Sequence, residues 1–449
     1  MQDYLVRLAQ KHETFRKPEL QALAEAEGVE MEIVEYHDES PFMIVRLPSP
    51  EDAAKLIRRS ILTMSIFEIW GIGTSHESMH ASVKTQSAHL WPQYATASFS
   101  FTIDSFQGSL PSAQKTALME SFAYLPLTGP IVMKNPAIQL WILEEYSLGS
   151  ASPKRVAMGR LIAHSGRRTV DKYDLKKRRY ISTTSMDSEL ALITANLALA
   201  GPGKLCYDPF TGTGSFPIAC AHFGATVLGS DIDGRSIRGK RGRNVVANFE
   251  QYNLLPRYLD GFVSDLTNTP LRPSRYLDAL VCDPPYGVRE GLKVLGSART
   301  DLQAKQPVIL SDGVAAHLKP DYIPPKRAYS FEAMMDDILD FGYAMLVDGG
   351  RLAMWMPTAN DEDIALAIPT HPGLELVAVC VQQFNKWARR LLTYRRVEEG
   401  RVDAGAVERR RATREVREGT TADELNQFRR KFFQGFREQD EAAGPATPS

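Results

Sequence analysis

The chain has 449 residues, of which 43% are hydrophobic and 24% charged, and its formal net charge is −1. The length predicts two or three domains, and the charge excludes a protein that is basic over its whole surface while permitting a local basic patch. None of the four cysteines stands at Cys-x-x-Cys spacing, so we expect no disulfide framework and no bound metal. No apolar run is long enough to span a bilayer, and the N-terminus lacks a secretion signal, so we expect a soluble cytoplasmic protein.

The first 80 residues have the pattern of a small α+β domain. Strands are predicted at Tyr4–Leu8, Met31–Tyr36, Phe42–Leu47 and Ile66–Ile72. Pro18 suits the first position of a helix that ends at Gly28, and Ser49 suits the N-cap of a helix that runs to about Ser60. The resulting order is ferredoxin-like, and we place this domain at residues 1–80. That order serves many unrelated functions and indicates none of them.

Residues 81–165 form a second predicted α+β unit. Its expected elements are strands at Ser98–Ile103, Ile138–Leu143 and Val156–Ile162 and a helix at Ser112–Tyr124. Residues 166–185 then form a basic linker, whose cations are Arg167, Arg168, Lys172, Lys176, Lys177, Arg178 and Arg179. Such a run can be a solvated face. Its position between an accessory unit and a catalytic-looking one favours contact with a nucleic-acid backbone.

Residues 186–400 repeat a strand–turn–helix pattern, which is typical of a Rossmann-like α/β fold with a mostly parallel seven-stranded sheet. Ser185 is expected to cap the first helix. Strands are predicted at Leu205–Tyr207, Thr226–Ser230, Gly261–Ser264, Ala279–Cys282, Arg351–Met356, Leu374–Val381 and Leu391–Val397. Further helices are predicted at Ser215–Phe223, Ile237–Phe249 and Phe331–Leu346.

Two further segments differ from this pattern. The stretch between Gly287 and Ser330 is long, irregular and rich in Pro and Gly, which in a compact domain indicates a functional or a disordered loop. Residues 401–449 form a tail dominated by charge. An apolar helical face in this tail predicts a docked C-terminal amphipathic helix, and its residues are Leu425, Phe428, Phe432 and Phe436.

A glycine loop, Asp208-Pro-Phe-Thr-Gly-Thr-Gly-Ser215, follows one predicted strand and precedes a helix. Gly212 and Gly214 can adopt positive φ and let the backbone approach a ligand closely. The loop lacks the third glycine of a dinucleotide fingerprint and the lysine of a phosphate loop. Asp208 would repel a pyrophosphate but suits the cationic end of S-adenosylmethionine. The alternative interpretation is a tight turn with packing glycines.

Acidic residues at successive strand ends favour the cofactor interpretation. Asp231, Asp265 and Asp283 each follow a predicted strand. Asp231 is in the position that commonly binds ribose hydroxyls, and Asp265 suits the adenine amino group. A single acid could cap the next element. Three of them at the edge where open α/β sheets bind ligands are hard to explain as caps.

The sequence Asp283-Pro284-Pro285-Tyr286 predicts a clamp for a planar amino group. The carboxylate of Asp283 and the carbonyl of Pro284 can each accept one N–H of an exocyclic amine, which directs the nitrogen lone pair at a methyl group. Tyr286 offers a face on which the substrate stacks. A nucleobase target would have to leave its stack to reach this site. His222 and Cys282 are interpreted as structural residues.

These motifs resemble the amino-methyltransferases and, more narrowly, the catalytic subunit of eukaryotic tRNA (guanine-10-N2)-methyltransferase. The segments that carry the narrower resemblance are Arg179–Asp187, Tyr322–Arg327, Asn385–Tyr394 and Phe428–Phe436. The resemblance implies that the first 165 residues end in a THUMP domain that recognises tRNA, at residues 81–165. It implies that residues 186–400 are an S-adenosylmethionine-dependent methyltransferase domain. It also implies a heterodimer with a small activator subunit that binds zinc.

By the same resemblance, each part of the site has a role. The cofactor residues are Asp208, Phe210, Gly212 and Gly214 with Thr184 and Ser185 at the methionine end, Asp231 at the ribose and Asp265 at the adenine. The guanine N2 amine would lie against Asp283, Pro284 and Tyr286. The tRNA would contact Arg167, Arg168, Lys177, Arg178 and Arg179.

Two alternatives stay open at this point. The amine clamp is equally suited to adenine N6 or to the side-chain amide of a protein glutamine. A chain of this pattern can also be an RNA-binding subunit that keeps the cofactor fold without turnover. The intact Gly212, Asp283 and Tyr286 favour an enzyme.

Overall fold

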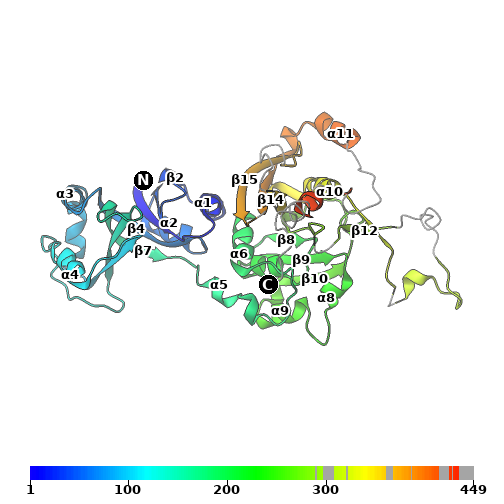
Figure 1. Ribbon diagram of the computed structural model, residues 1–449, viewed down its shortest axis with the longest axis horizontal. Coiled ribbons are helices and arrows are strands. Elements are labelled where there is room, and N and C mark those ends of the chain that lie inside the picture. The colour runs from blue at the N-terminus through cyan, green and yellow to red at the C-terminus, as the bar shows by residue number, and fades with distance from the viewer. Residues whose placement is uncertain are drawn as a thin grey trace, which may run out of the picture. The chain divides into compact units, whose positions relative to one another are not determined.

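The computed structural model describes residues 1–288, 291–296, 308–319, 322–359, 368–385, 387–413, 424–426 and 428–433. The chain divides into two compact units, Met1–Lys172 and Tyr173–Ser449, each with its own sheet (Figure 1). Each unit also has its own hydrophobic core. Within the described ranges, no helix is both long enough and apolar enough to cross a membrane.

The first unit is built on a seven-stranded sheet with the order β2-β3-β1-β4-β7-β6-β5. Its strands are β1 (Gln2–Leu8), β2 (Glu32–Tyr36), β3 (Phe42–Leu47), β4 (Thr63–Gly73), β5 (Phe99–Phe106), β6 (Ile138–Tyr146) and β7 (Pro153–His164). Its helices are α1 (Glu13–Glu27), α2 (Pro50–Ile57), α3 (His76–Gln86), α4 (Ser112–Glu120) and α5 (Thr169–Lys172), with a 3-10 turn at Ala88–Tyr94.

The predicted ferredoxin-like order is confirmed by β1-α1-β2-β3-α2-β4 and by the antiparallel pairing of these strands. Ser49 caps α2, since its hydroxyl accepts the Asp52 N–H, and Gly28 ends α1 at a φ of 63°. The prediction that Pro18 starts the first helix was wrong, because α1 begins at Glu13. The helix therefore has one more turn before Pro18 than predicted. Burial of Phe15 in this turn offsets the loss of the backbone hydrogen bond that Pro18 cannot donate.

The sheet of this unit continues across the boundary that we predicted at residue 80. β4 pairs antiparallel with β7, β7 pairs with β6, and β6 lies parallel to β5. The ferredoxin-like part and the predicted THUMP part therefore share one backbone hydrogen-bond network.

The second unit has a seven-stranded sheet with the order β10-β9-β8-β11-β14-β16-β15. Its strands are β8 (Leu205–Asp208), β9 (Thr226–Asp231), β10 (Tyr258–Val263), β11 (Leu277–Cys282), β14 (Leu346–Ala359), β15 (Leu374–Gln383) and β16 (Trp387–Arg396). The first five are parallel, and β16 runs antiparallel to β14 and β15. This confirms the predicted Rossmann-like fold. A separate antiparallel pair joins β12 (Lys293–Leu295) to β13 (Lys326–Ala328).

The helices of this unit correct two predictions. They are α6 (Ser188–Leu197), α7 (Ser215–His222), α8 (Gly234–Arg238), α9 (Val245–Gln251), α10 (Phe331–Met345) and α11 (Ala404–Thr413), with 3-10 turns at Leu175–Lys177, Leu255–Arg257, Ala316–Leu318 and Glu399–Arg401. The single helix predicted at Ile237–Phe249 is wrong, because Gly239 and Gly242 adopt positive φ between α8 and α9. Ser185 does not cap α6, since Asp187 accepts the N–H groups of Glu189 and Leu190.

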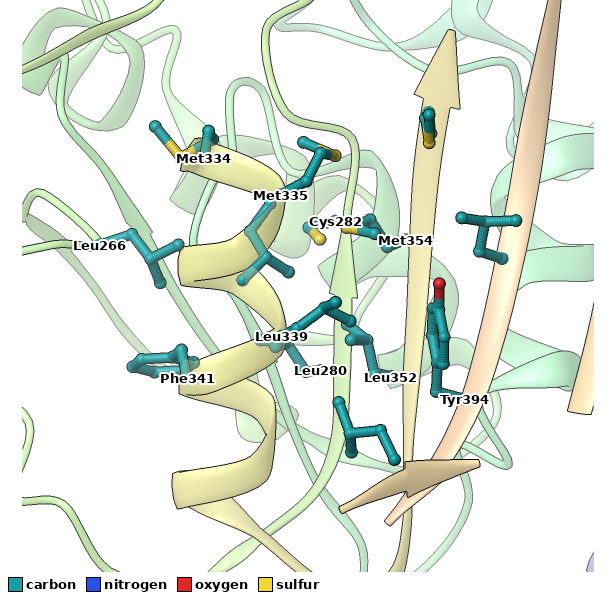
Figure 2. Packing of buried hydrophobic residues seen from close by; sticks show 14 of the residues in the cluster. Leu266, Leu280, Cys282, Met334, Met335, Leu339, Phe341, Leu352, Met354 and Tyr394 are labelled. Carbon is teal, nitrogen blue, oxygen red and sulfur yellow. The ribbon is translucent and has the colours of Figure 1, made fainter. Parts of the chain in front are cut away.

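The core of the second unit lies between α10 and the centre of the sheet. Figure 2 shows α10 side chains such as Met335 and Leu339 packed towards Leu280 of β11 and Leu352 of β14. All four residues are at most 3% exposed. This core holds the central strands in register, and their carboxyl ends form the edge at which the predicted site residues lie.

Candidate active site

Four aspartates meet at one edge of the second sheet. Asp208 and Asp231 are the last residues of β8 and β9, Asp283 directly follows β11, and Asp265 comes two residues after β10. These four strands are neighbours and parallel, so their carboxyl ends lie side by side. The structure thus brings together residues that the sequence separates by up to 75 positions (283 − 208).

The two loop glycines have different environments. Both have positive φ, +53° at Gly212 and +86° at Gly214, as predicted. A Cβ on Gly212 would meet nothing nearer than a backbone oxygen at 3.9 Å, whereas one on Gly214 would meet Val245 Cγ1 at 3.1 Å. Gly212 therefore leaves open space for a ligand, and Gly214 serves close packing of the loop on α9.

Asp208 carries an unsatisfied carboxylate oxygen. Its Oδ1 accepts the N–H of Phe210 at 2.9 Å, while its Oδ2 is buried and has no hydrogen-bond partner among the described residues. Burial raises the pKa of Asp208 well above its ordinary value, and the negative charges of Asp231 and Asp283 raise it further. A cationic ligand group beside Oδ2 would remove this penalty. Phe210 is half-buried and packs on the core under the loop.

Asp231 and Asp265 organise the backbone of this edge. The carboxylate of Asp231 accepts the N–H of Gly212 at 2.9 Å and that of Asp233 at 2.8 Å. The buried carboxylate of Asp265 accepts the N–H of Thr267 at 2.9 Å and that of Leu295 at 2.7 Å. Asp231 stays half-exposed, while Asp265 joins the β12 strand to the sheet edge.

The segment before α6 reaches the glycine loop through Ser185. The hydroxyls of Ser185 and Thr213 are 2.7 Å apart, and Thr184 lies exposed beside Ser182. Arg178 is buried and donates from Nη1 to Ser215 Oγ at 2.8 Å. Arg178 therefore supports the loop, and its burial argues against the phosphate contact that we predicted for it.

The other predicted RNA residues are more accessible. Arg168, Lys177 and Arg179 are exposed, and Arg167 is half-buried with its guanidinium donating to the carbonyl of Ile61.

Asp283 lies in a nearly closed environment at the end of β11. Its side chain is 21% exposed, the Tyr286 hydroxyl donates to Oδ1, and Arg389 Nη1 is 4.0 Å from Oδ2. Burial raises the pKa of Asp283 to about 6, while the Arg389 charge and the Tyr286 hydrogen bond oppose that rise. Pro284 is buried directly after it. At pH 7 a carboxyl group with this pKa is mostly ionised, so Asp283 can accept hydrogen bonds.

Arg389 was not among the predicted site residues. It comes from β16, and its guanidinium lies over the Trp355 ring at 4.7 Å and the Phe384 ring at 5.7 Å. Its Nε donates to the side-chain oxygen of Gln382. These contacts aim the charge at Asp283. The run Asn385–Tyr394 carried a family resemblance, and it was the sequence signal that could have identified Arg389.

The C-terminal segment docks on the clamp, as its apolar face predicted. Leu425 and Phe428 are buried and residues 428–433 are helical, while Phe436 lies outside the described residues. Asn426 donates from Nδ2 to the carbonyl of Tyr286 at 2.9 Å, and Arg429 donates to the carbonyl of Gly287.

An aromatic cluster joins this segment to the clamp. The Trp387 ring lies 5.9 Å from that of Phe428 and 6.1 Å from that of Tyr286. Residues far along the chain therefore fix the backbone that follows Pro284.

The remaining predictions concern residues without a catalytic role. Cys282 is part of the core, and His222 is 3.0 Å from the Tyr173 hydroxyl through Nδ1, so both have the structural surroundings that we expected. Within the described part of the chain, no group of three or more His, Cys, Asp and Glu residues is arranged to hold a metal ion.

Comparisons with known proteins cover nearly the whole chain. Residues 2–167 match the family model "Tmrp11 THUMP N-terminal domain", and residues 176–298 match "RMKL-like, methyltransferase domain". The tRNA (guanine(10)-N(2))-methyltransferase of Saccharomyces cerevisiae is 42% identical over 403 residues, covering 88% of this chain and 93% of that protein. The protein of the same name from Schizosaccharomyces pombe is 39% identical over 433 residues, covering 88% and 90%.

Among solved structures, TrmN from Thermus thermophilus aligns with a TM-score of 0.41 at 18% identity, covering 88% of this chain and all of that one. The identities to the two yeast proteins and the extent of their coverage are sufficient to assign the family. The chain belongs to the tRNA (guanine(10)-N(2))-methyltransferase family.

Proposed function

We propose that this chain transfers a methyl group from S-adenosylmethionine to the N2 amine of guanosine 10 in tRNA. The observation that carries the proposal is the clamp, in which Asp283, Pro284 and Tyr286 follow the strand next to the glycine loop. The relatives from two yeasts are named for this reaction. The family match favours guanine over the other planar amines that such a clamp could bind.

The residues around the glycine loop fit the proposed cofactor. S-adenosylmethionine supplies a methyl group on a positively charged sulfur. The unpaired Oδ2 of Asp208 suits the cationic methionine end, and the open face of Gly212 admits it. Asp231 would take the ribose hydroxyls. The Ser185 hydroxyl would lie near the methionine end, and the adenine contact of Asp265 and a role for Thr184 stay predictions.

The clamp residues would activate the amine by orienting it. The Asp283 carboxylate accepts one N–H of the guanine N2 amine and the Pro284 carbonyl accepts the other, so that the nitrogen lone pair faces the methyl group. The Tyr286 hydroxyl fixes the carboxylate through its hydrogen bond. Methylation makes the nitrogen acidic, and Asp283, with a pKa of about 6, can then accept the proton.

The first unit would select the RNA. Its match to a THUMP-type domain supports tRNA recognition. Arg167, Arg168, Lys177 and Arg179 stay candidates for phosphate contacts, while Arg178 is omitted because it is buried. A small zinc-binding activator subunit as heterodimer partner is also proposed from the sequence resemblance. A location in the cytoplasm is proposed from the cysteine pattern and the N-terminal sequence.

The experiment compares wild type, Asp283→Ala and Asp260→Ala, the last an exposed aspartate on β10. Each is incubated with labelled S-adenosylmethionine and tRNA, with and without the small subunit, and the nucleosides are then separated. Wild type and Asp260→Ala should form N2-methylguanosine, while Asp283→Ala should form none and still bind tRNA. N6-methyladenosine as the product, or near-normal activity of Asp283→Ala, would reject the proposal.

A further inference from the structure

Residues 235–243, which comprise most of α8 and part of the loop after it, are a concentrated source of positive charge and are called the basic loop. Residues 235–243 contain five cations and no acid, although the whole chain has a net charge of −1. The cations are Arg235, Arg238, Lys240, Arg241 and Arg243. A charge cluster of this density in a near-neutral chain points to an anionic ligand.

A tight turn gives this loop a defined shape. Lys240 and Arg243 exchange both backbone hydrogen bonds, at 3.1 and 3.0 Å. The two residues between them, Arg241 and Gly242, have φ values of 53° and 73°, which is the geometry of a type I′ turn. Lys240 and Arg243 therefore stand opposite each other at the base of the turn, where any side chain is tolerated.

The segment Arg179–Ile181 forms the other wall. The Arg179 N–H donates to the side chain of Gln251 at 2.9 Å, and the Tyr180 N–H donates to that of Asn248 at 2.9 Å. The Tyr180 hydroxyl donates to the carbonyl of Ser236 at 2.9 Å. These bonds attach the segment to both α9 and the basic loop, so Arg179 is presented from an anchored backbone.

An open pocket of about 430 Å³ lies between these walls. Its lining residues are Arg179, Tyr180, Ile181, Arg235, Arg238, Gly239, Lys240 and Arg243. Arg235 pairs with Asp233. The other four cations of the lining form no ion pair within the described ranges and are exposed. The pocket therefore offers four uncompensated charges to a ligand.

The pocket belongs to the same edge of the sheet as the clamp. Its basic loop leaves β9 just after Asp231, and β9 is separated from β11 and Asp283 by β8 alone. The carboxyl ends of β9 and β11 are therefore two strand spacings apart, roughly 10 Å, which equals about three nucleotide steps of a stacked strand. An RNA strand that delivers a base to the clamp can thus reach the pocket with its backbone.

We propose that this pocket binds phosphodiester groups of the substrate RNA next to the nucleotide to be methylated. The planar guanidinium groups of Arg179, Arg238 and Arg243 suit phosphate oxygens, to which they can donate two bonds each. A base drawn into the clamp leaves its neighbours' phosphates at the protein surface, where fixed cations hold the strand open. This site deepens the proposed function and rests on it.

The test uses the double variant Lys240→Glu/Arg243→Glu in the full chain. Both positions flank the turn, so glutamate fits without strain. Arg272→Glu is a control that reverses a single charge, because Arg272 is exposed and precedes β11 at the opposite end of the strands. Lys240→Arg/Arg243→Lys preserves the charge. Binding of an unmodified tRNA transcript is measured from 50 to 200 mM salt, and S-adenosylmethionine affinity is measured separately by calorimetry.

The charge-reversed double variant should bind tRNA about tenfold more weakly at low salt, and its log–log salt slope should be shallower by about two. Its affinity for S-adenosylmethionine should be unchanged, as should tRNA binding by Arg272→Glu. Lys240→Arg/Arg243→Lys should keep the wild-type salt slope, because it keeps both charges. An unchanged salt slope, or an equal loss of tRNA affinity in Arg272→Glu, would overturn the RNA site. It would also be overturned if the double variant lost binding of inorganic phosphate while its tRNA affinity stayed the same. Because the readout is RNA binding, a wrong identity of the methylated atom would leave this result intact.

Discussion

Replacing Arg389 with methionine should shift the pH dependence of methyl transfer. Arg389 Nη1 is 4.0 Å from Asp283 Oδ2, and the two side chains are only 16% and 21% exposed. A unit charge at this distance contributes between about 1 kcal/mol in water and about 4 kcal/mol at an effective dielectric constant near 20. One pKa unit corresponds to about 1.4 kcal/mol, so the pKa of Asp283 should rise by roughly one to three units.

The measured quantity is kcat/KM for tRNA between pH 5 and 9. Since the ionised carboxylate accepts the amine N–H, activity should fall below a midpoint near the wild-type pKa of about 6. In Arg389→Met the midpoint should lie between about pH 7 and about pH 9. At pH 6.5 this means a loss of about threefold or more, which becomes smaller as the pH rises to 9. Methionine keeps an apolar stem against Trp355, so packing is largely preserved.

The control is Arg395→Met on the same strand. Arg395 pairs with Glu375 at the other end of β16, and both side chains are about half exposed, so its removal should leave the profile unchanged. An equal loss at every pH in Arg389→Met, with an unmoved midpoint, would refute the reasoning. Arg389 would then act through packing or RNA contact.

Two further predictions concern the clamp. Asp283→Asn should abolish methyl transfer yet stabilise the fold. Burial raises the pKa of Asp283 from 3.8 to about 6, so the wild-type protein loses stability as the pH rises through that window, whereas the asparagine variant does not. The gain in free energy of unfolding should reach up to about 3 kcal/mol at pH 7.5 and be small at pH 4, and equal gains at both pH values would contradict it. Asn426→Ala removes the donor to the Tyr286 carbonyl and should lower kcat about tenfold with unchanged cofactor affinity. Arg430→Ala, exposed on the same segment, is its control, and an equal effect in both would refute a positioning role.

Local signals were sufficient for most of the elements and for the conformation of the glycine loop. The positive φ of Gly212 and Gly214 follows from a glycine loop between a strand and a helix, and the aspartates at strand ends follow from the parallel fold. The wrong helix prediction arose because one local pattern was given more weight than another. Helical periodicity over Ile237–Phe249 concealed two glycines whose φ values end one helix and start a turn.

By itself, the sequence determined the fold class and most of the elements, because backbone preference depends on neighbours in the chain. It also predicted Asp283, Pro284 and Tyr286 as an amine clamp, and the structure places Asp283 directly after β11. The tertiary structure decided which side chains complete the clamp. Arg389 reaches Asp283 because β16 is inserted antiparallel beside β14, and Asn426 reaches Tyr286 across 140 residues. It also decided that Arg178 is buried under the glycine loop while Arg179 lines a basic pocket. Burial and charge pairing depend on segments that meet only in the folded chain, so adjacent residues with the same side chain acquire opposite roles.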